Sequence, residues 1–166
     1  MARNSKIRSF FLPAFTAAFI VRIGIVALAA YLFFSQVCIP LHIEGYSMEP
    51  TYVNGDFTFC WKLHYVFSEP QRGDIILIRF AGKRVMLLKR IIAVEGEIVE
   101  FRGGRLFIDF KKVDEPYVVY SGDWNLEPRK VKGGNVYVAG DNRSAPIEQH
   151  MFGQTSSQRI VGVPLW

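Results

Sequence analysis

The stretch Arg84-Val85-Met86-Leu87-Leu88-Lys89-Arg90-Ile91-Ile92-Ala93-Val94 (RVMLLKRIIAV) is the longest strand-like run in the chain. Successive side chains of a β-strand point to opposite faces, so Lys89 shares the apolar face with Leu87 and Ile91. Arg90 points to the other face. A lysine in such a run is often an edge-strand residue that discourages aggregation, and the strand pattern by itself favours that interpretation. The alternative is a desolvated amine, because burial disfavours the charged form and lowers the pKa of a lysine.

Short strand-like segments separated by glycine-rich turns surround this run. The two alternating arms 97–101 and 106–109 flank Gly103-Gly104, which supplies the positive φ of a two-residue hairpin turn. No amphipathic helix is evident after residue 44, and the polar residues 110–132 are expected to form an insertion or a long surface hairpin. The pattern predicts a mostly β domain, an antiparallel sheet or partly closed barrel. Further strands are expected at 56–61, 74–80, 135–138 and 159–163.

A long apolar run precedes these strands. Between Ser9 and Ile43 the only charged residue is Arg22, and the 19 residues from 23 to 41 carry no charge. Because a bilayer core of ~30 Å needs about 20 helical residues, the run predicts a transmembrane helix that Pro40 ends. We expect Arg22 at the interface and residues 9–21 in an interfacial helix. A longer helix in which Arg22 snorkels is the alternative.

The charges before this run predict its orientation. They are Arg3, Lys6, Arg8 and Arg22, and the positive-inside rule keeps that end in the cytoplasm. A cleaved secretory signal peptide is the alternative, but the run is long and no clear A-x-A site closes it. We therefore divide the chain into a cytoplasmic N-terminus and transmembrane anchor, residues 1–43, and an extracytoplasmic β-domain, residues 44–166.

The composition narrows the possible functions. The chain has 166 residues, of which 50% are hydrophobic, and a formal net charge of +5. No later block of Lys and Arg is interleaved with aromatics, so nucleic-acid binding is not expected. Cys38 and Cys60 are expected to be separate packed thiols. The three histidines are scattered and no CxxC or HExxH motif occurs, so neither a metal site nor a cofactor is expected.

The stretch Gly45-Tyr46-Ser47-Met48-Glu49-Pro50-Thr51 places a serine directly after the apolar run. A serine hydroxyl becomes a nucleophile only when a base takes its proton. The stretch is not a G-x-S-x-G elbow, and no histidine has a recognisable partner. Lysine is the other known base, and it must be desolvated to be neutral near pH 7, which suits Lys89. Taken alone, however, Ser47 is a turn serine, and residues 140–144 (GDNRS) form a turn after a strand.

Four stretches taken together resemble the type I signal peptidases. Ser47 followed by Met-x-Pro-Thr after a membrane span resembles the nucleophile box of that family. The segment 72–76 (RGDII) is similar to the next box, 88–92 (LKRII) to the box with the general-base lysine, and 140–143 (GDNR) to the last. Phe152-Gly153 follows as in the family. The boxes occur in the family's order, from the anchor to the end of the chain.

The resemblance implies a membrane-bound serine endopeptidase that removes signal peptides from exported preproteins. It implies that Ser47 is the nucleophile, that Lys89 is the general base, and that the Ser47 backbone N–H contributes to the oxyanion hole. Some members carry a hydroxyl where this chain has Gly45, so a second donor must come from elsewhere. The supporting residues implied around the pair are Arg90, Asp141, Asn142, Arg143, Ser144 and Glu148.

The last box departs from the family pattern. Pro146 stands where the family commonly has a serine that contacts the lysine, and it cannot donate a hydrogen bond. Ser144 is the candidate substitute. Glu148, Gln149 and His150 replace an Asp-Ser-Arg run, and Glu148 is expected to keep the acid and pair with Arg90. These changes indicate a divergent branch, such as the maturation peptidases of conjugation systems.

The expected partners are preproteins and membrane lipids, in a single-pass protein of the bacterial plasma membrane. An extended substrate is expected to add as a strand beside residues 41–45 and 85–88. The expected contacts with this strand are Ile43, Gly45, Val85 and Leu87. Two alternatives remain at this point, namely a membrane-anchored peptide-binding β-domain that does not cleave and a histidine-dependent serine hydrolase.

Overall fold

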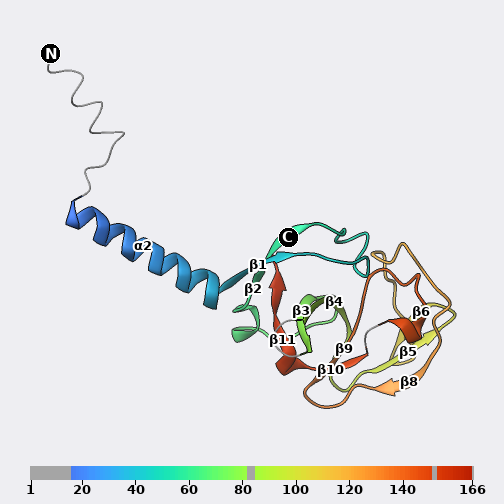
Figure 1. Ribbon diagram of the computed structural model, residues 1–166. Coiled ribbons are helices and arrows are strands. Elements are labelled where there is room, and N and C mark those ends of the chain that lie inside the picture. Colours follow the sequence, from blue (N-terminus) through green and yellow to red (C-terminus); the bar gives the residue numbers. More distant parts are fainter. Residues whose placement is uncertain (1–15, 82–84, 151–152, 166) are drawn as a thin grey trace. The chain divides into compact units, whose positions relative to one another are not determined.

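The computed structural model describes residues 16–81, 85–150 and 153–165 (Figure 1). It divides into two units, one ending at Val37 and the other beginning at Cys38. The first unit contains helix α2 (Ala17–Gln36) and the second contains all of the described strands. The mostly β fold that the sequence predicts after an N-terminal helix is thereby confirmed.

Helix α2 has 20 residues, and it is long and apolar enough to cross a membrane, with a mean hydropathy of 2.3. At 1.5 Å per residue such a helix is about 30 Å long. The Thr16 side chain caps its start by accepting a hydrogen bond from the Phe19 N–H at 3.3 Å. The helix runs through Arg22 without a break, as the longer-helix alternative requires. Residues 9–15 of the expected interfacial helix lie outside the described residues.

The predicted end of the helix at Pro40 is wrong. Helix α2 ends at Gln36, and Cys38–His42 form strand β1. All five residues of β1 pair with strand β2 (Phe57–Trp61), which is remote in sequence, and this ladder decides their conformation. Pro40 fits because β1 is an edge strand, where a missing N–H donor on the outer side costs little. Both Cys38 and Cys60 are buried free thiols, as expected.

Within its described residues, the β unit contains two antiparallel sheets and three short 3₁₀ helices (Figure 1). The seven-stranded sheet has the order β1-β2-β11-β3-β4-β9-β10, and the four-stranded sheet has the order β7-β6-β5-β8. The remaining elements are β3 (Ile75–Ala81), β4 (Val85–Ala93), β5 (Ile98–Arg102), β6 (Arg105–Ile108), β7 (Lys111–Lys112), β8 (Leu126–Lys130), β9 (Asn135–Ala139), β10 (Gln154–Ser156), β11 (Ile160–Pro164), η1 (His64–Val66), η2 (Ile147–Gln149) and η3 (Ser157–Arg159).

The larger sheet curls on itself. Three strands separate β1 from β4 in the sheet order, yet residues 39–44 and the β4 side chains Met86 and Leu88 line one hollow. This curvature is what the predicted partly closed barrel requires. Residues 110–132 are not merely an insertion, because β7 and β8 within them extend the smaller sheet.

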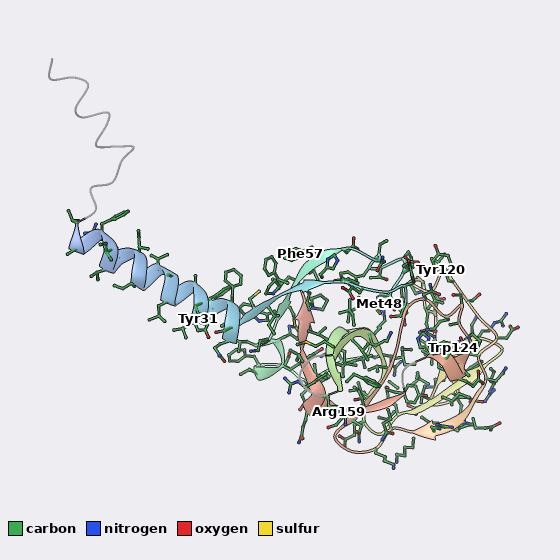
Figure 2. The ribbon with its side chains drawn as sticks, in the orientation of Figure 1. Tyr31, Met48, Phe57, Tyr120, Trp124 and Arg159 are labelled. Atoms are coloured by element: carbon green, nitrogen blue, oxygen red, sulfur yellow. The ribbon has the colours of Figure 1, made fainter. Side chains whose placement is uncertain are left out.

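Strand β4 is an interior strand of the larger sheet. It pairs with β3 along its length and with β9 from Arg90 to Ala93. Its side chains enter two different cores, with Ile91 in one that includes Val138 and Ile92 in another that includes Trp124. A third cluster contains Met48, which is buried like Trp124 (both are labelled in Figure 2). Packing on both faces therefore fixes the position of β4 in the unit.

The hairpin β5–β6 turns at Gly103-Gly104, as the sequence predicts. Their φ angles are +52° and +75°, and Arg102 pairs with Arg105 across the turn. Only Gly104 is also crowded, because a Cβ there would lie 2.1 Å from the carbonyl oxygen of Gly122. The backbone N–H of Gly104 donates a hydrogen bond to the Trp124 carbonyl at 2.9 Å.

The two turn glycines predict unequal costs of substitution. Gly103→Ala should lower the free energy of unfolding by roughly 1 kcal/mol, because alanine is strained at positive φ. Gly104→Ala should cost about 1–3 kcal/mol more, since its Cβ collides with the Gly122 backbone. Urea unfolding of the full chain in detergent, followed by tryptophan fluorescence, measures both values. Equal losses for the two variants would contradict the close approach of residues 104 and 122.

Candidate active site

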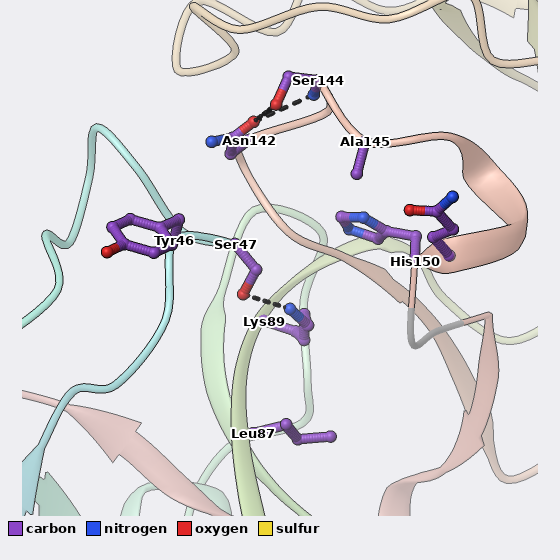
Figure 3. Close-up of a pocket in the computed structure, with 9 residues that line it drawn as sticks. Tyr46, Ser47, Leu87, Lys89, Asn142, Ser144, Ala145 and His150 are labelled. Carbon is purple, nitrogen blue, oxygen red and sulfur yellow. Dashed lines mark hydrogen bonds between the residues drawn. The ribbon is translucent and has the colours of Figure 1, made fainter.

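The structure brings Ser47 and Lys89 into direct contact. Ser47 lies in the turn that follows β1, and Lys89 lies in β4, 42 residues later. The Lys89 Nζ donates a hydrogen bond to the Ser47 Oγ at 2.5 Å (Figure 3). The contact joins a candidate nucleophile to a candidate base without any side chain between them.

Lys89 is buried, so it is not the exposed edge lysine that the strand pattern by itself favours. Its side chain is 4% exposed, and the residue pairs with Ile76 of β3. Burial lowers the pKa of Lys89 to about 8, and the negative charge of Asp141 opposes this effect. A substantial fraction of the amine is therefore neutral near physiological pH, as a general base must be.

The backbone of Ser47 is held by the segment that follows β9. The Asn142 N–H donates a hydrogen bond to the Ser47 carbonyl at 3.1 Å. Gly140 packs so closely that a Cβ on it would lie 2.1 Å from the same carbonyl oxygen. On the other side, the N–H of Gly45, which has a φ of +97°, donates to the Asn54 Oδ1 at 2.9 Å. The Ser47 backbone is therefore held directly at its carbonyl, and also indirectly through Gly45, two residues earlier in the chain.

A buried ion pair between Arg90 and Asp141 lies on the face of β4 opposite to Lys89, and it supports the contact between Ser47 and Lys89. The Arg90 Nε and Nη2 donate to the two carboxylate oxygens of Asp141 at 2.8 and 2.7 Å. The Arg90 Nη1 donates to the Gly73 carbonyl at 2.7 Å, and the Thr51 hydroxyl donates to the Asp141 Oδ2 at 2.5 Å. One cluster thus joins all four of the sequence stretches that contain the candidate site residues.

The expectation that Glu148 pairs with Arg90 is wrong, because Asp141 occupies that position. Glu148 is exposed in η2, whereas Asp141 is fully buried beneath the Arg90 guanidinium. The error arose because spacing along the chain cannot distinguish two carboxylates in the same box. The sequence alone assigns no role to Thr51 of the nucleophile stretch, and the structure supplies one through its hydrogen bond to Asp141.

Arg143 is buried by contacts that the sequence did not reveal. Its Nη2 donates to the Glu115 Oε1 at 2.8 Å and its Nε donates to the Gly140 carbonyl at 2.5 Å. Its guanidinium lies 5.1 Å from the ring centre of Trp124. Glu115 belongs to the polar segment 110–132, which has no pattern that marks a functional residue. Arg143 therefore braces the Gly140 turn against which Ser47 packs.

Asn142 and Ser144 form a local bond beside the candidate nucleophile. The Ser144 hydroxyl and N–H both donate to the Asn142 Oδ1, at 2.6 and 3.0 Å (Figure 3). This orients the amide of Asn142, whose own backbone N–H binds the Ser47 carbonyl. The structure thus places Ser144 in the wall beside Ser47 and Lys89, next to Ala145.

His150 is a site residue that the sequence left without a partner. Its Nε2 accepts a hydrogen bond from the Gly140 N–H at 3.1 Å, and its ring packs edge-on against Trp124 at 4.5 Å. The pKa of His150 is lowered to about 4, mainly by burial and to a smaller extent by the positive charges of Lys89 and Arg143. The imidazole is therefore neutral at pH 7. Both partners are tertiary neighbours, and no local motif marks them.

Two hollows adjoin the candidate site. One has a volume of about 290 Å³ and contains Ser47 and Lys89, together with Tyr46, Leu87, Asn142, Ser144, Ala145, Gln149 and His150 (Figure 3). The other, of about 350 Å³, is lined by residues 39–44 together with Leu77, Met86 and Leu88. Of the expected substrate contacts, Leu87 lines the hollow that contains Ser47, and Ile43 lines the hollow beside β1. The side chain of Val85 lies outside the described part of the structure.

This fold and site define a class of protein. An antiparallel β unit, preceded in the chain by an apolar helix, holds a serine hydroxyl against a buried lysine, an arrangement used by serine hydrolases with a lysine base. The family model "Signal peptidase, peptidase S26" matches residues 16–165, and the chain belongs to this family.

The chain is also similar to individual peptidases from bacteria and from a plant chloroplast. The chain is 34% identical over 135 residues to the probable signal peptidase I-1 of Synechocystis, which covers 76% of this chain and 69% of the relative. It is 34% identical over 136 residues to signal peptidase I of Bacillus licheniformis, covering 74% and 72%. It is 32% identical over 142 residues to thylakoidal processing peptidase 1 of Arabidopsis thaliana, covering 79% of this chain and only 42% of that protein.

Substitution of the two acidic residues of the last box, Asp141 and Glu148, should affect the free energy of unfolding very differently. Asp141→Asn removes the partner of a largely buried guanidinium, so the free energy of unfolding should fall by roughly 3–5 kcal/mol. Glu148→Gln, the matched control on an exposed residue, should change it by less than about 0.5 kcal/mol. Urea unfolding of the full chain in detergent compares the two. The assignment fails if Glu148→Gln is the more damaging change.

Proposed function

We propose that this chain is a membrane-anchored serine endopeptidase that removes signal peptides from exported preproteins. Ser47 is the nucleophile and Lys89 is the general base. The observation that carries the proposal is the 2.5 Å contact between the Ser47 Oγ and the buried Nζ of Lys89. Membership of the signal peptidase family and the names of the bacterial relatives support the choice of substrate.

The reaction follows from this geometry. Neutral Lys89 takes the proton of the Ser47 hydroxyl as the Oγ attacks the scissile carbonyl, and the Ser47 N–H stabilises the resulting oxyanion. When the tetrahedral intermediate collapses, the ammonium of Lys89 returns its proton to the departing amine, which leaves an acyl-enzyme. Lys89 then deprotonates a water molecule that attacks the ester, and the released Ser47 oxygen regains its proton from Lys89.

The extended part of the substrate binds between β1 and β4. The outer edge of β1 carries no strand, and β4 pairs with β9 only from Arg90 onward, so the edge of residues 85–89 is also unpaired among the described residues. A substrate strand can add there through backbone hydrogen bonds. Its first and third residues before the cut face the same side, toward the 350 Å³ apolar hollow beside Ile43 and Leu88. Because two substrate residues share this one hollow, it favours short side chains at both positions.

The anchor explains where the reaction takes place. Helix α2 is the membrane span, and Ser47 follows its last residue by only 11 positions in the numbering. The cleavage site of a preprotein also emerges at the membrane surface, so a nucleophile close to its own span meets it at a high effective concentration. The protein crosses the bacterial plasma membrane once, with the chain up to Val37 as cytoplasmic end and anchor and the β unit from Cys38 onward outside the cytoplasm.

The orientation is tested by protease protection. In sealed inside-out vesicles, a protease added outside should leave the C-terminal β-domain intact, because that domain then lies in the lumen. The same domain should be digested when the vesicles are opened by detergent. Immunoblotting of a C-terminal tag measures the result. Digestion in sealed inside-out vesicles would reverse the proposed topology.

Substitution of either member of the pair should abolish cleavage. Ser47→Ala removes the nucleophile and Lys89→Met removes the base, so each should lower kcat/KM for a preprotein by at least about 10³-fold. The exposed Lys111→Met is the matched control and should cleave at the wild-type rate. Cleavage by Lys89→Met at the wild-type rate would overturn the lysine base. If the unmodified chain cleaves no preprotein at all, it is a peptide-binding domain instead.

The pH dependence of cleavage separates the lysine from a histidine base in the same experiment. Only the neutral amine accepts a proton, so kcat/KM should rise about tenfold per pH unit and level off near the Lys89 pKa of about 8. A base with the pKa of His150, about 4, would already be fully active at pH 6. A flat profile between pH 6 and 8 would therefore contradict the assignment to Lys89.

A further inference from the structure

Because alternate side chains of β4 point to opposite faces, they line two different hollows, and the proposed function assigns a different part of the substrate to each. Met86 and Leu88 point into the hollow next to β1, whereas Leu87 and Lys89 point into the hollow that contains Ser47. The residues of a substrate before the cut occupy the first hollow, as argued above. The second hollow is therefore still without an occupant, although it contains the reactive atoms.

The proton transfer to the leaving group determines which part of the substrate lies over the second hollow. The amine released by cleavage must come within hydrogen-bond reach of the Lys89 Nζ, about 2.6–3.2 Å. Because Lys89 and Ser47 both line this hollow, the residue that carries the amine lies over it. That residue is the first one after the scissile bond, and its side chain is the nearest group that can enter.

Apart from Lys89, the side chains that line this hollow are uncharged at pH 7. Ala145 is held in place because its carbonyl accepts a hydrogen bond at 2.7 Å from the indole N–H of Trp124, which is itself buried. The His150 ring is neutral at pH 7, and Leu87 supplies the apolar wall opposite (Figure 3). None of the side chains lining the hollow is a carboxylate.

These walls determine which side chains are accepted. A carboxylate beside Lys89 would favour the ammonium form and so remove the base, while a cation would be repelled by the ammonium that forms during the reaction. A neutral, largely apolar side chain avoids both penalties and gains from contact with Leu87 and Ala145. The volume of about 290 Å³ is close to the lower limit of ~300 Å³ for small-ligand sites, and so suits one side chain.

We propose that the hollow formed by Tyr46, Leu87, Ala145 and His150 beside Lys89 is the specificity pocket for the residue after the scissile bond, and that it selects an uncharged apolar side chain. This assignment rests on the proposed function. It makes Ala145 a residue at which added bulk would enter the pocket, because its methyl group lies in the lining beside the His150 ring (Figure 3).

The test uses one preprotein with Ala, Leu, Glu or Lys directly after the cleavage site, and the full chain in detergent. We expect kcat/KM for Leu to exceed that for Glu and for Lys by at least about tenfold. In Ala145→Phe the new ring fills the pocket, so the ratio of kcat/KM for Leu to that for Ala should fall at least about tenfold. A ratio measured on one variant is independent of the fraction of enzyme that is folded.

Met86→Phe is the matched control, because it adds bulk to the hollow on the other face of β4. It should leave the Leu-to-Ala ratio at its wild-type value and alter the preference for residues before the cut. The pocket assignment is overturned if Ala145→Phe leaves the ratio unchanged, or if Glu or Lys is preferred by the wild-type enzyme. Failure to cleave any of the four substrates would instead overturn the proposed function, and the pocket assignment with it.

Discussion

The buried ion pair between Arg90 and Asp141 is the constraint on which the site depends. Two charges with exposed fractions of 11% and 0% lose most of their hydration, and only bidentate geometry with further hydrogen bonds offsets that loss. Here the Thr51 hydroxyl donates a further hydrogen bond to Asp141, and Arg90 donates one to the Gly73 carbonyl. Four separate chain segments thus compensate for the hydration that the two charges lose. Since Arg90 follows Lys89 in β4, fixing one side chain fixes the register that delivers the other to Ser47.

The same pair affects the proposed base through its charge. Asp141 raises the pKa of Lys89, and burial, which lowers it, is the larger effect. The arginine neutralises much of the carboxylate, so the site can hold a structural anion near the amine without keeping the amine protonated. His150 completes this balance, because a half-buried neutral ring lines the hollow near Lys89 without adding a second cation.

Local patterns predicted much of this structure, and tertiary partners decided the rest. The alternation of residues 84–94 predicted β4 and the face of Lys89, and Gly103-Gly104 predicted the hairpin, because both depend on the backbone nearby. Strand β1 was missed because its apolar residues also suit a helix, and its ladder with β2 decides between them. Glu115 and His150 were missed because their partners, Arg143 and Gly140, are adjacent to them only in the folded chain.

The departure at Pro146 can be understood in the same terms. The family resemblance places a serine at this position, in contact with the lysine, and proline has no hydroxyl for such a contact. Pro146 instead begins the 3₁₀ turn 147–149, whose end places His150 against Gly140 and Trp124. Gly140 in turn packs on the Ser47 carbonyl, so this segment supports the serine. Lys89 lies in β4, which pairs with β3 along its length and packs into two cores, so its place beside Ser47 follows from the packing of its own strand.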